Sequence, residues 1–94
     1  MSERTDAALA KLDELTPALD TLPQSRELDT LIENTQALRR AVAAFHMEAI
    51  RFRMYNVDRG LKASGDPAHV RHIYDELRQA LEAAGFHTRS HTAP

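Results

Sequence analysis

The chain has 94 residues, of which 43% are hydrophobic and 28% charged, and its formal net charge is −2 at pH 7. This length suits one small domain. The absence of Cys excludes a disulfide scaffold, a thiolate metal site and a cysteine nucleophile. No apolar run approaches the roughly 18 residues of a membrane-spanning helix, and the first residues lack the pattern of a signal peptide. We therefore expect a cytoplasmic protein with no membrane partner.

The charge is unevenly distributed along the chain. Residues 1–33 carry a net charge of −5, whereas residues 34–94 carry +3. A basic stretch can bind phosphate backbones, which makes a nucleic-acid-binding module that uses its arginines one interpretation. Because the isoelectric point of the chain lies near 6.2, pairing between the two ends explains the pattern better, within one chain or across a dimer. Nucleic acid is therefore not the expected partner.

The first helix is predicted over residues 5–15, with an extension to about residue 20. Its apolar side recurs every three or four residues, at Ala8, Leu9, Leu12 and Leu15. Pro17 is expected to kink this helix or to restart it, and Pro23 ends the segment.

The strongest signal is a second, long helix that begins near Gln24 or Ser25. Neither Pro nor Gly interrupts residues 24–59, and Ser25 suits an N-cap. If the helix runs to Ala63, it has about 40 residues and a length of about 60 Å. Gly60 is a possible early end, and Gly65 is the more complete stop.

A third helix is predicted over residues 67–84, with Gly85 as its stop. Its apolar stripe recurs at helical spacing and consists of Val70, Ile73, Tyr74, Leu77, Leu81 and Ala84. Residues 1–86 then form a single helical domain, and residues 87–94 a flexible C-terminal tail.

Two apolar stripes follow the long helix. The first has the alternating spacing of a heptad repeat and consists of Leu28, Leu31, Thr35, Leu38, Val42, Phe45, Ala49 and Phe52. The second begins halfway along and consists of Ala43, Met47, Ile50, Met54, Val57 and Leu61. At about 100° per residue the stripes lie about 150° apart, so the second half of the helix is apolar on nearly opposite sides.

A helix with two apolar sides is buried from both directions, and the two shorter helices are too small to cover both. The predicted fold is therefore all-α, a three-helix chain with one long central helix in an antiparallel bundle that forms a homodimer. A slender three-helix monomer is the alternative. The second stripe is assigned to the subunit interface, through Met47, Ile50, Met54, Val57 and Leu61.

Polar residues between the stripes are candidates for a ligand-binding or catalytic site. His46 and Arg53 lie two turns apart on a narrow strip, and Glu48 and Tyr55 lie on the wider polar side. A histidine beside an arginine can line a small anion pocket. The alternative for these residues is a solvated face with ion pairs that contribute little to stability.

The histidines of the last third give a weak metal signal. His69 and His72 are three residues apart, close to Asp75 and Glu76. The spacing matches neither the HExxH motif nor the Glu-x-x-His pairs of di-iron bundles. His87 and His91 fall in the tail, so no metal and no cofactor are expected.

Taken together, these patterns predict a small non-enzymatic module for protein interaction or assembly. Its expected partner is a second copy of the chain, with another protein as a further candidate. The ligand-binding or catalytic bundle and the nucleic-acid-binding module are the alternatives.

Overall fold

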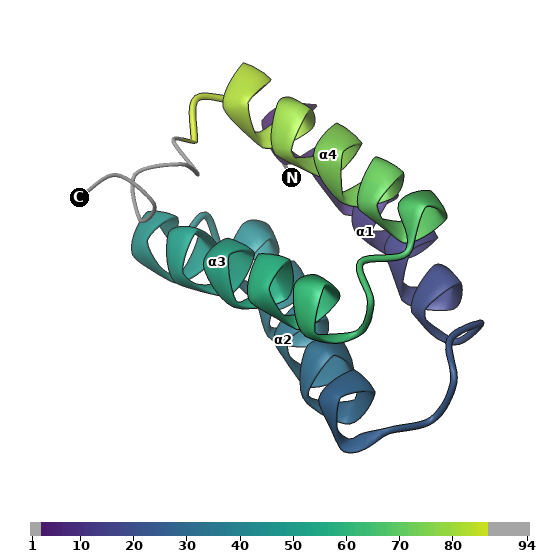
Figure 1. Ribbon diagram of the computed structural model, residues 1–94. Coiled ribbons are helices and arrows are strands. Elements are labelled where there is room, and N and C mark those ends of the chain that lie inside the picture. The colour runs from purple at the N-terminus through teal and green to yellow at the C-terminus, as the bar shows by residue number, and fades with distance from the viewer. Residues whose placement is uncertain (1–2, 87–94) are drawn as a thin grey trace.

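The computed structural model describes residues 3–86, with side chains from Thr5 onward, and these form four α-helices. They are α1 (Glu3–Leu19), α2 (Arg26–Ala43), α3 (Met47–Ala63) and α4 (Ala68–Ala83). Figure 1 shows α1 beside α4 and α2 beside α3, and α1 also packs against α2. Both pairs are antiparallel, so the fold is a four-helix bundle. None of the helices in residues 3–86 is both long enough and apolar enough to span a bilayer.

The prediction of three helices with one long central helix is wrong, because segment 24–63 breaks at Phe45. The φ angle of Phe45 is 58°, in the left-handed region. The Phe45 N–H donates to the Val42 carbonyl at 3.1 Å, and the His46 N–H donates to the Ala41 carbonyl at 3.0 Å. This pair of hydrogen bonds is a Schellman C-cap, in which the left-handed position usually holds Gly. With Phe in that position, the sequence carries no Gly or Pro to mark the end of α2.

The other helix ends follow the sequence more closely. Ser25 caps α2 as predicted, because its Oγ accepts a hydrogen bond from the Leu28 N–H at 3.0 Å. Gly65 and Gly85 have φ angles of 89° and 98° and follow α3 and α4, where Gly is favoured. The first helix continues through Pro17 to Leu19. The tail predicted at 87–94 lies outside the described residues.

The break at Phe45 separates the two halves of the first apolar stripe. Its members on α2 are buried, and they are Leu28, Leu31, Thr35, Leu38 and Val42. Beyond the break, Phe45 and Phe52 are instead 44% and 48% exposed. The left-handed residue changes the direction of the chain, so α3 folds back along α2 with a different side toward the core.

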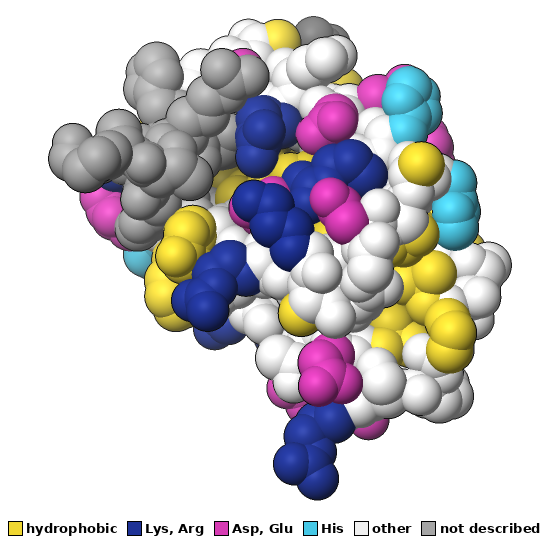
Figure 2. All heavy atoms as spheres, in the orientation of Figure 1, with side chains coloured by type: hydrophobic (Ala, Val, Ile, Leu, Met, Phe, Trp, Pro, Cys, Tyr) yellow, Lys and Arg dark blue, Asp and Glu magenta, His cyan; other side chains and the backbone are white. Residues whose placement is uncertain are grey.

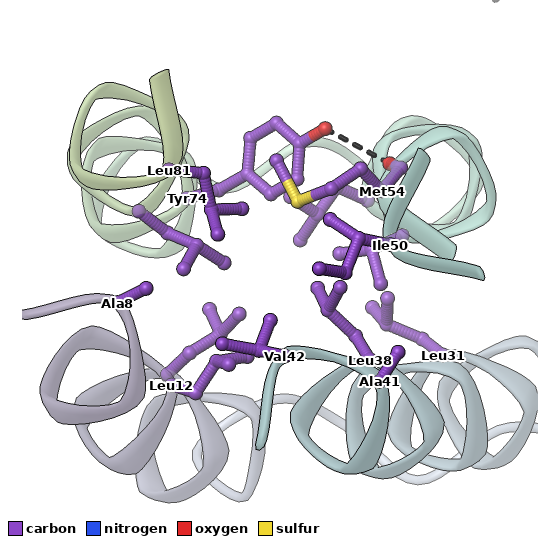
Figure 3. Packing of buried hydrophobic residues seen from close by; sticks show 14 of the residues in the cluster. Ala8, Leu12, Leu31, Leu38, Ala41, Val42, Ile50, Met54, Tyr74 and Leu81 are labelled. Carbon is purple, nitrogen blue, oxygen red and sulfur yellow. Dashed lines mark hydrogen bonds between the residues drawn. The ribbon is translucent and has the colours of Figure 1, made fainter. Parts of the chain in front are cut away.

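The second apolar stripe forms the side of α3 that faces the core. Ile50, Met54, Val57 and Leu61 are fully buried within one chain, and Figure 3 shows Ile50 and Met54 directed into the cluster from α3. Their assignment to a subunit interface is corrected accordingly, because the chain's own helices cover them. Met47 is partly buried against the same core. Self-association stays a prediction, and these four side chains no longer support it.

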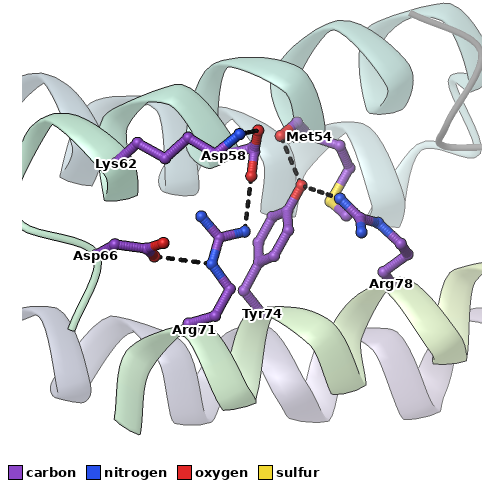
Figure 4. Close-up of polar contacts among 7 residues, drawn as sticks. All are labelled: Met54, Asp58, Lys62, Asp66, Arg71, Tyr74 and Arg78. Atoms are coloured by element: carbon purple, nitrogen blue, oxygen red, sulfur yellow. Dashed lines mark hydrogen bonds and ion pairs between the residues drawn. The ribbon is translucent and has the colours of Figure 1, made fainter. Parts of the chain in front are cut away.

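Long side chains join α3 to α4 (Figure 4). The Tyr74 hydroxyl donates to the Met54 carbonyl at 2.9 Å, and the Arg71 Nη1 donates to Asp58 at 2.6 Å. Lys62 contacts the same carboxylate from one turn further along α3, at 3.2 Å. We call this side-chain layer the α3–α4 seam. Because its ion pairs are partly buried, solvent screens them less than it screens exposed pairs.

We expect the stability of the bundle to fall in acid, partly through Asp58. Burial acts to raise the pKa of Asp58, but hydrogen bonds from Arg71 and Lys62 outweigh it and hold the pKa below its ordinary value of 3.8. A carboxyl whose pKa is lower in the folded chain stabilises the fold above its unfolded pKa. That contribution is lost as the pH falls through the folded pKa.

Asp58→Asn tests this dependence by urea denaturation at neutral pH and below about pH 3. The variant should lose about 1–2 kcal/mol of unfolding free energy at neutral pH and less in acid. Its stability should therefore vary less with pH than that of the wild-type protein. Equal pH dependence in the two proteins would contradict a role for Asp58.

Candidate functional site

His46 and Arg53, predicted to line one pocket, point to different surroundings. His46 is the exposed N-cap residue of α3, and its side chain makes no capping hydrogen bond. The Arg53 Nη1 donates to the Asn34 Oδ1 on α2 at 2.8 Å. Arg53 is thereby held against α2, two turns away from His46.

Glu48 and Tyr55, the other two candidates, face away from Arg53. Positions 53 and 55 lie about 160° apart around an α-helix. Glu48 pairs with Arg51 at 3.5 Å, and the Tyr55 ring lies 5.7 Å from the Arg59 guanidinium. The predicted ligand-binding set is therefore dispersed over several sides of α3 and forms no common pocket.

The histidines of α4 contact single partners. The His69 Nε2 lies 3.3 Å from the Thr21 hydroxyl, and the His72 Nε2 lies 3.2 Å from the Glu76 carboxylate. Within residues 3–86, no three His, Asp or Glu side chains converge as metal ligands would. Two further candidates lie outside the described residues: His87 and His91.

Two hollows lie between α2 and α3, and we call them together the α2–α3 groove. Its wider hollow has a volume of about 370 Å³ and is lined by Arg26, Glu27, Thr30, Leu31, Asn34, Asn56, Arg59, Gly60 and Ala63. A second hollow of about 320 Å³ is lined by Glu33, Asn34, Gln36, Ala37, Arg40 and Arg53. Asn34 lines both hollows, so they adjoin each other along the two helices.

Small and amide side chains form the middle of the groove. A Cβ atom at Gly60 would lie 2.9 Å from the Leu31 Cδ1, so the lack of a side chain allows α2 and α3 to approach closely here. The Asn34 Oδ1 accepts hydrogen bonds from Arg53 at 2.8 Å and from Asn56 at 3.3 Å. These contacts fix the amides and one arginine relative to both helices.

Arginines line both ends of the groove. Arg26 and Arg40 come from α2, and Arg53 and Arg59 come from α3. None of the four makes an ion pair with a carboxylate of the described residues. Three other arginines each contact a carboxylate: Arg39, Arg51 and Arg71. With the two lining glutamates counted, the groove retains two positive charges.

Phe52 extends one wall of the groove. Residues 52, 56, 59 and 63 recur every three or four positions and thus share one side of α3, and the last three line the groove. The Phe52 ring is 48% exposed, and the Arg53 guanidinium lies 5.1 Å from its centroid. An exposed aromatic ring therefore lies beside an arginine of the groove, and such pairs are common in protein interfaces.

Comparison with family models, with curated proteins and with solved structures gives no match to this chain. Its function is therefore inferred from the shape and charge of its own surface. Sequence reasoning noted the basic residues after residue 33, but it did not single out Arg26, Asn34 or Asn56. The spacing of Arg26, Thr30, Glu33, Ala37 and Arg40 is a signal for one polar side of a helix. Only the return of α3 gives that side a second wall.

Proposed function

We propose that this protein is a non-enzymatic interaction module whose α2–α3 groove binds an acidic segment of another protein. The proposal rests on the gathering of four arginines without carboxylate partners along this one groove. A guanidinium group binds a carboxylate through two parallel hydrogen bonds, which are stronger than neutral ones. No carboxylate of the described residues forms an ion pair with these arginines, and the bound segment would supply the carboxylates.

The length of the groove suits a short amphipathic helix. Arg26 and Arg40 are separated by about 21 Å along α2, which corresponds to about 14 residues of helix. The wider hollow has small apolar positions at Gly60 and Ala63, beside the buried Leu31. A matching segment has acidic residues near both ends and small apolar residues between them.

The composition of the groove favours a protein partner over nucleic acid. Glu27 and Glu33 interrupt the arginines that line the groove, so its positive charge is unevenly spaced, whereas the charges of a phosphate backbone repeat at every nucleotide. Among the described residues no aromatic side chain lines either hollow, and Phe52 beside them is a single ring, so the groove offers no row of aromatic side chains on which successive bases could stack.

The same groove gives little support for catalysis. Its lining contains no His, Ser or Tyr, and its two carboxylates come from one helix, at Glu27 and Glu33. The residues predicted as a catalytic set are dispersed around α3. A binding role, with recognition by charge and shape, needs only the groups that the groove holds.

A fluorescein-labelled helical peptide with Glu residues near both ends and Ala residues between them tests the proposal by fluorescence anisotropy. We expect Arg53→Gln/Arg59→Gln to weaken its binding at least about tenfold, because two charge-assisted contacts are lost. Arg39→Gln is the control for an arginine outside the groove, since it removes one positive charge, where the groove variant removes two, from an exposed pair with Asp13. The same peptide with Gln in place of Glu should bind poorly to all three proteins.

Equal binding by the groove variant and the Arg39→Gln control would contradict the proposal. Tighter binding of a labelled duplex DNA than of the acidic peptide would favour the nucleic-acid alternative instead. Light scattering measures whether the protein forms the predicted homodimer. If a dimer forms and the groove variant is monomeric, the occupant of the groove is a second copy of the chain, with its acidic N-terminal third as the matching segment.

A further inference from the structure

The register of the α3–α4 seam places Arg51 opposite Arg78. The Tyr74 hydroxyl donates to the Met54 carbonyl, so these two residues face each other across the seam. Arg51 precedes Met54 by three residues, and Arg78 follows Tyr74 by four. Because α3 and α4 run antiparallel, both arginines lie about one turn further toward the same end of the seam. Figure 4 shows Arg78 extending from α4 to the Tyr74 hydroxyl, at 3.1 Å.

These two arginines have little compensating negative charge. The nearest carboxylate to Arg51 is Glu48 at 3.5 Å, and that side chain is 80% exposed. Arg78 makes no ion pair with any carboxylate among residues 5–86, and its contacts are the Tyr74 hydroxyl and ring. The other end of the seam is balanced in charge, through Asp58, Lys62, Asp66 and Arg71.

Hydrogen-bond donors at this end of the seam lack acceptors. The Nε atoms of Arg51 and Arg78 are shielded from solvent and have no hydrogen-bond partner among the described residues. Buried donors of this kind are rare in folded proteins, because each has lost its bond to water. Figure 2 shows the charged side chains that gather over the seam between α3 and α4.

We propose that Arg51 and Arg78 bind an oxyanion of the phosphate class between them. Two guanidinium groups supply two positive charges and planar donor sets, which match a phosphate dianion. The bound oxygens would accept hydrogen bonds from the terminal Nη groups of the two guanidiniums and relieve the repulsion between the two arginines. Arg51 lies about 160° around α3 from Arg53. The site is therefore separate from the α2–α3 groove and does not depend on its proposed function.

Titration with inorganic phosphate at constant ionic strength tests the site, with the Nε–H resonances of the arginines as the readout. We expect saturable shifts of the Arg51 and Arg78 signals and a phosphate-dependent rise in Tm. Arg78→Gln should weaken phosphate binding at least about tenfold. Arg78→Lys keeps the charge but lacks the planar donor set, so it should restore binding only in part.

Arg53→Gln is the matched control, because it removes an arginine of the groove and leaves the seam intact. It should bind phosphate as the wild-type protein does. The proposal is overturned if the Arg51 and Arg78 signals do not shift, or if Arg53→Gln weakens binding as much as Arg78→Gln. Should Arg78→Gln fail to fold, Arg51→Gln gives the same test from the other side of the seam.

Discussion

Ile50→Glu is expected to unfold the chain, with a loss of more than about 4 kcal/mol in the free energy of unfolding. Ile50 is fully buried among apolar side chains of several helices (Figure 3). A carboxylate there loses its hydration and gains no partner, while the apolar contacts of Ile50 are lost as well. Because small domains have only about 5–15 kcal/mol of stability, this loss is a large share of the total. Far-ultraviolet circular dichroism and urea denaturation measure it.

Phe52→Glu is the matched control, since it places the same charge on the same helix. The Phe52 ring is 48% exposed, so the new carboxylate stays hydrated beside Arg53. We expect a folded chain with a change of less than about 1 kcal/mol. If the Ile50→Glu protein is helical and monomeric while the Phe52→Glu protein is unfolded, Ile50 does not lie in the core of one chain. The second stripe would then again be assigned to a subunit interface.

The sequence predicts a helix end where a residue type marks it. Ser25 at the start of α2, and Gly65 and Gly85 after α3 and α4, act as expected. The end of α2 has the same Schellman hydrogen bonds, but its left-handed residue is Phe45, which local preferences place elsewhere. Tertiary packing decides this position, because the break allows the α2 part of the first stripe and the α3 part of the second to enter one core.

That single break also explains why the candidate site was not predicted. On a continuous helix, Arg26 and Arg59 would lie about 50 Å apart, and no groove would exist between them. In the bundle α3 returns along α2, and both arginines line one hollow. The four residues first considered as a ligand set were neighbours only in the sense of helical spacing. Asn34 on α2 fixes the position of Arg53, and sequence periodicity does not specify that partner.

Tyr74 joins α3 and α4 through its hydroxyl group, and its ring lies in the core. Its side chain is 1% exposed, and its hydroxyl both donates to the Met54 carbonyl and accepts from Arg78. Burial raises the pKa of the Tyr74 hydroxyl, although Arg78 opposes this effect. The hydroxyl therefore remains protonated, and remains a donor, throughout the neutral range.

Replacing Tyr74 in two steps separates the ring from the hydroxyl. Tyr74→Phe should cost about 1–2 kcal/mol of unfolding free energy, because the Arg78 guanidinium loses its hydroxyl acceptor and Met54 loses a donor. Tyr74→Ala should cost about 3–5 kcal/mol, since it also leaves a cavity between α4 and α3. Urea denaturation of both variants measures the difference. If Tyr74→Phe is as stable as the wild-type protein, the hydroxyl does not hold the seam, and apolar packing of the ring alone joins the two helices.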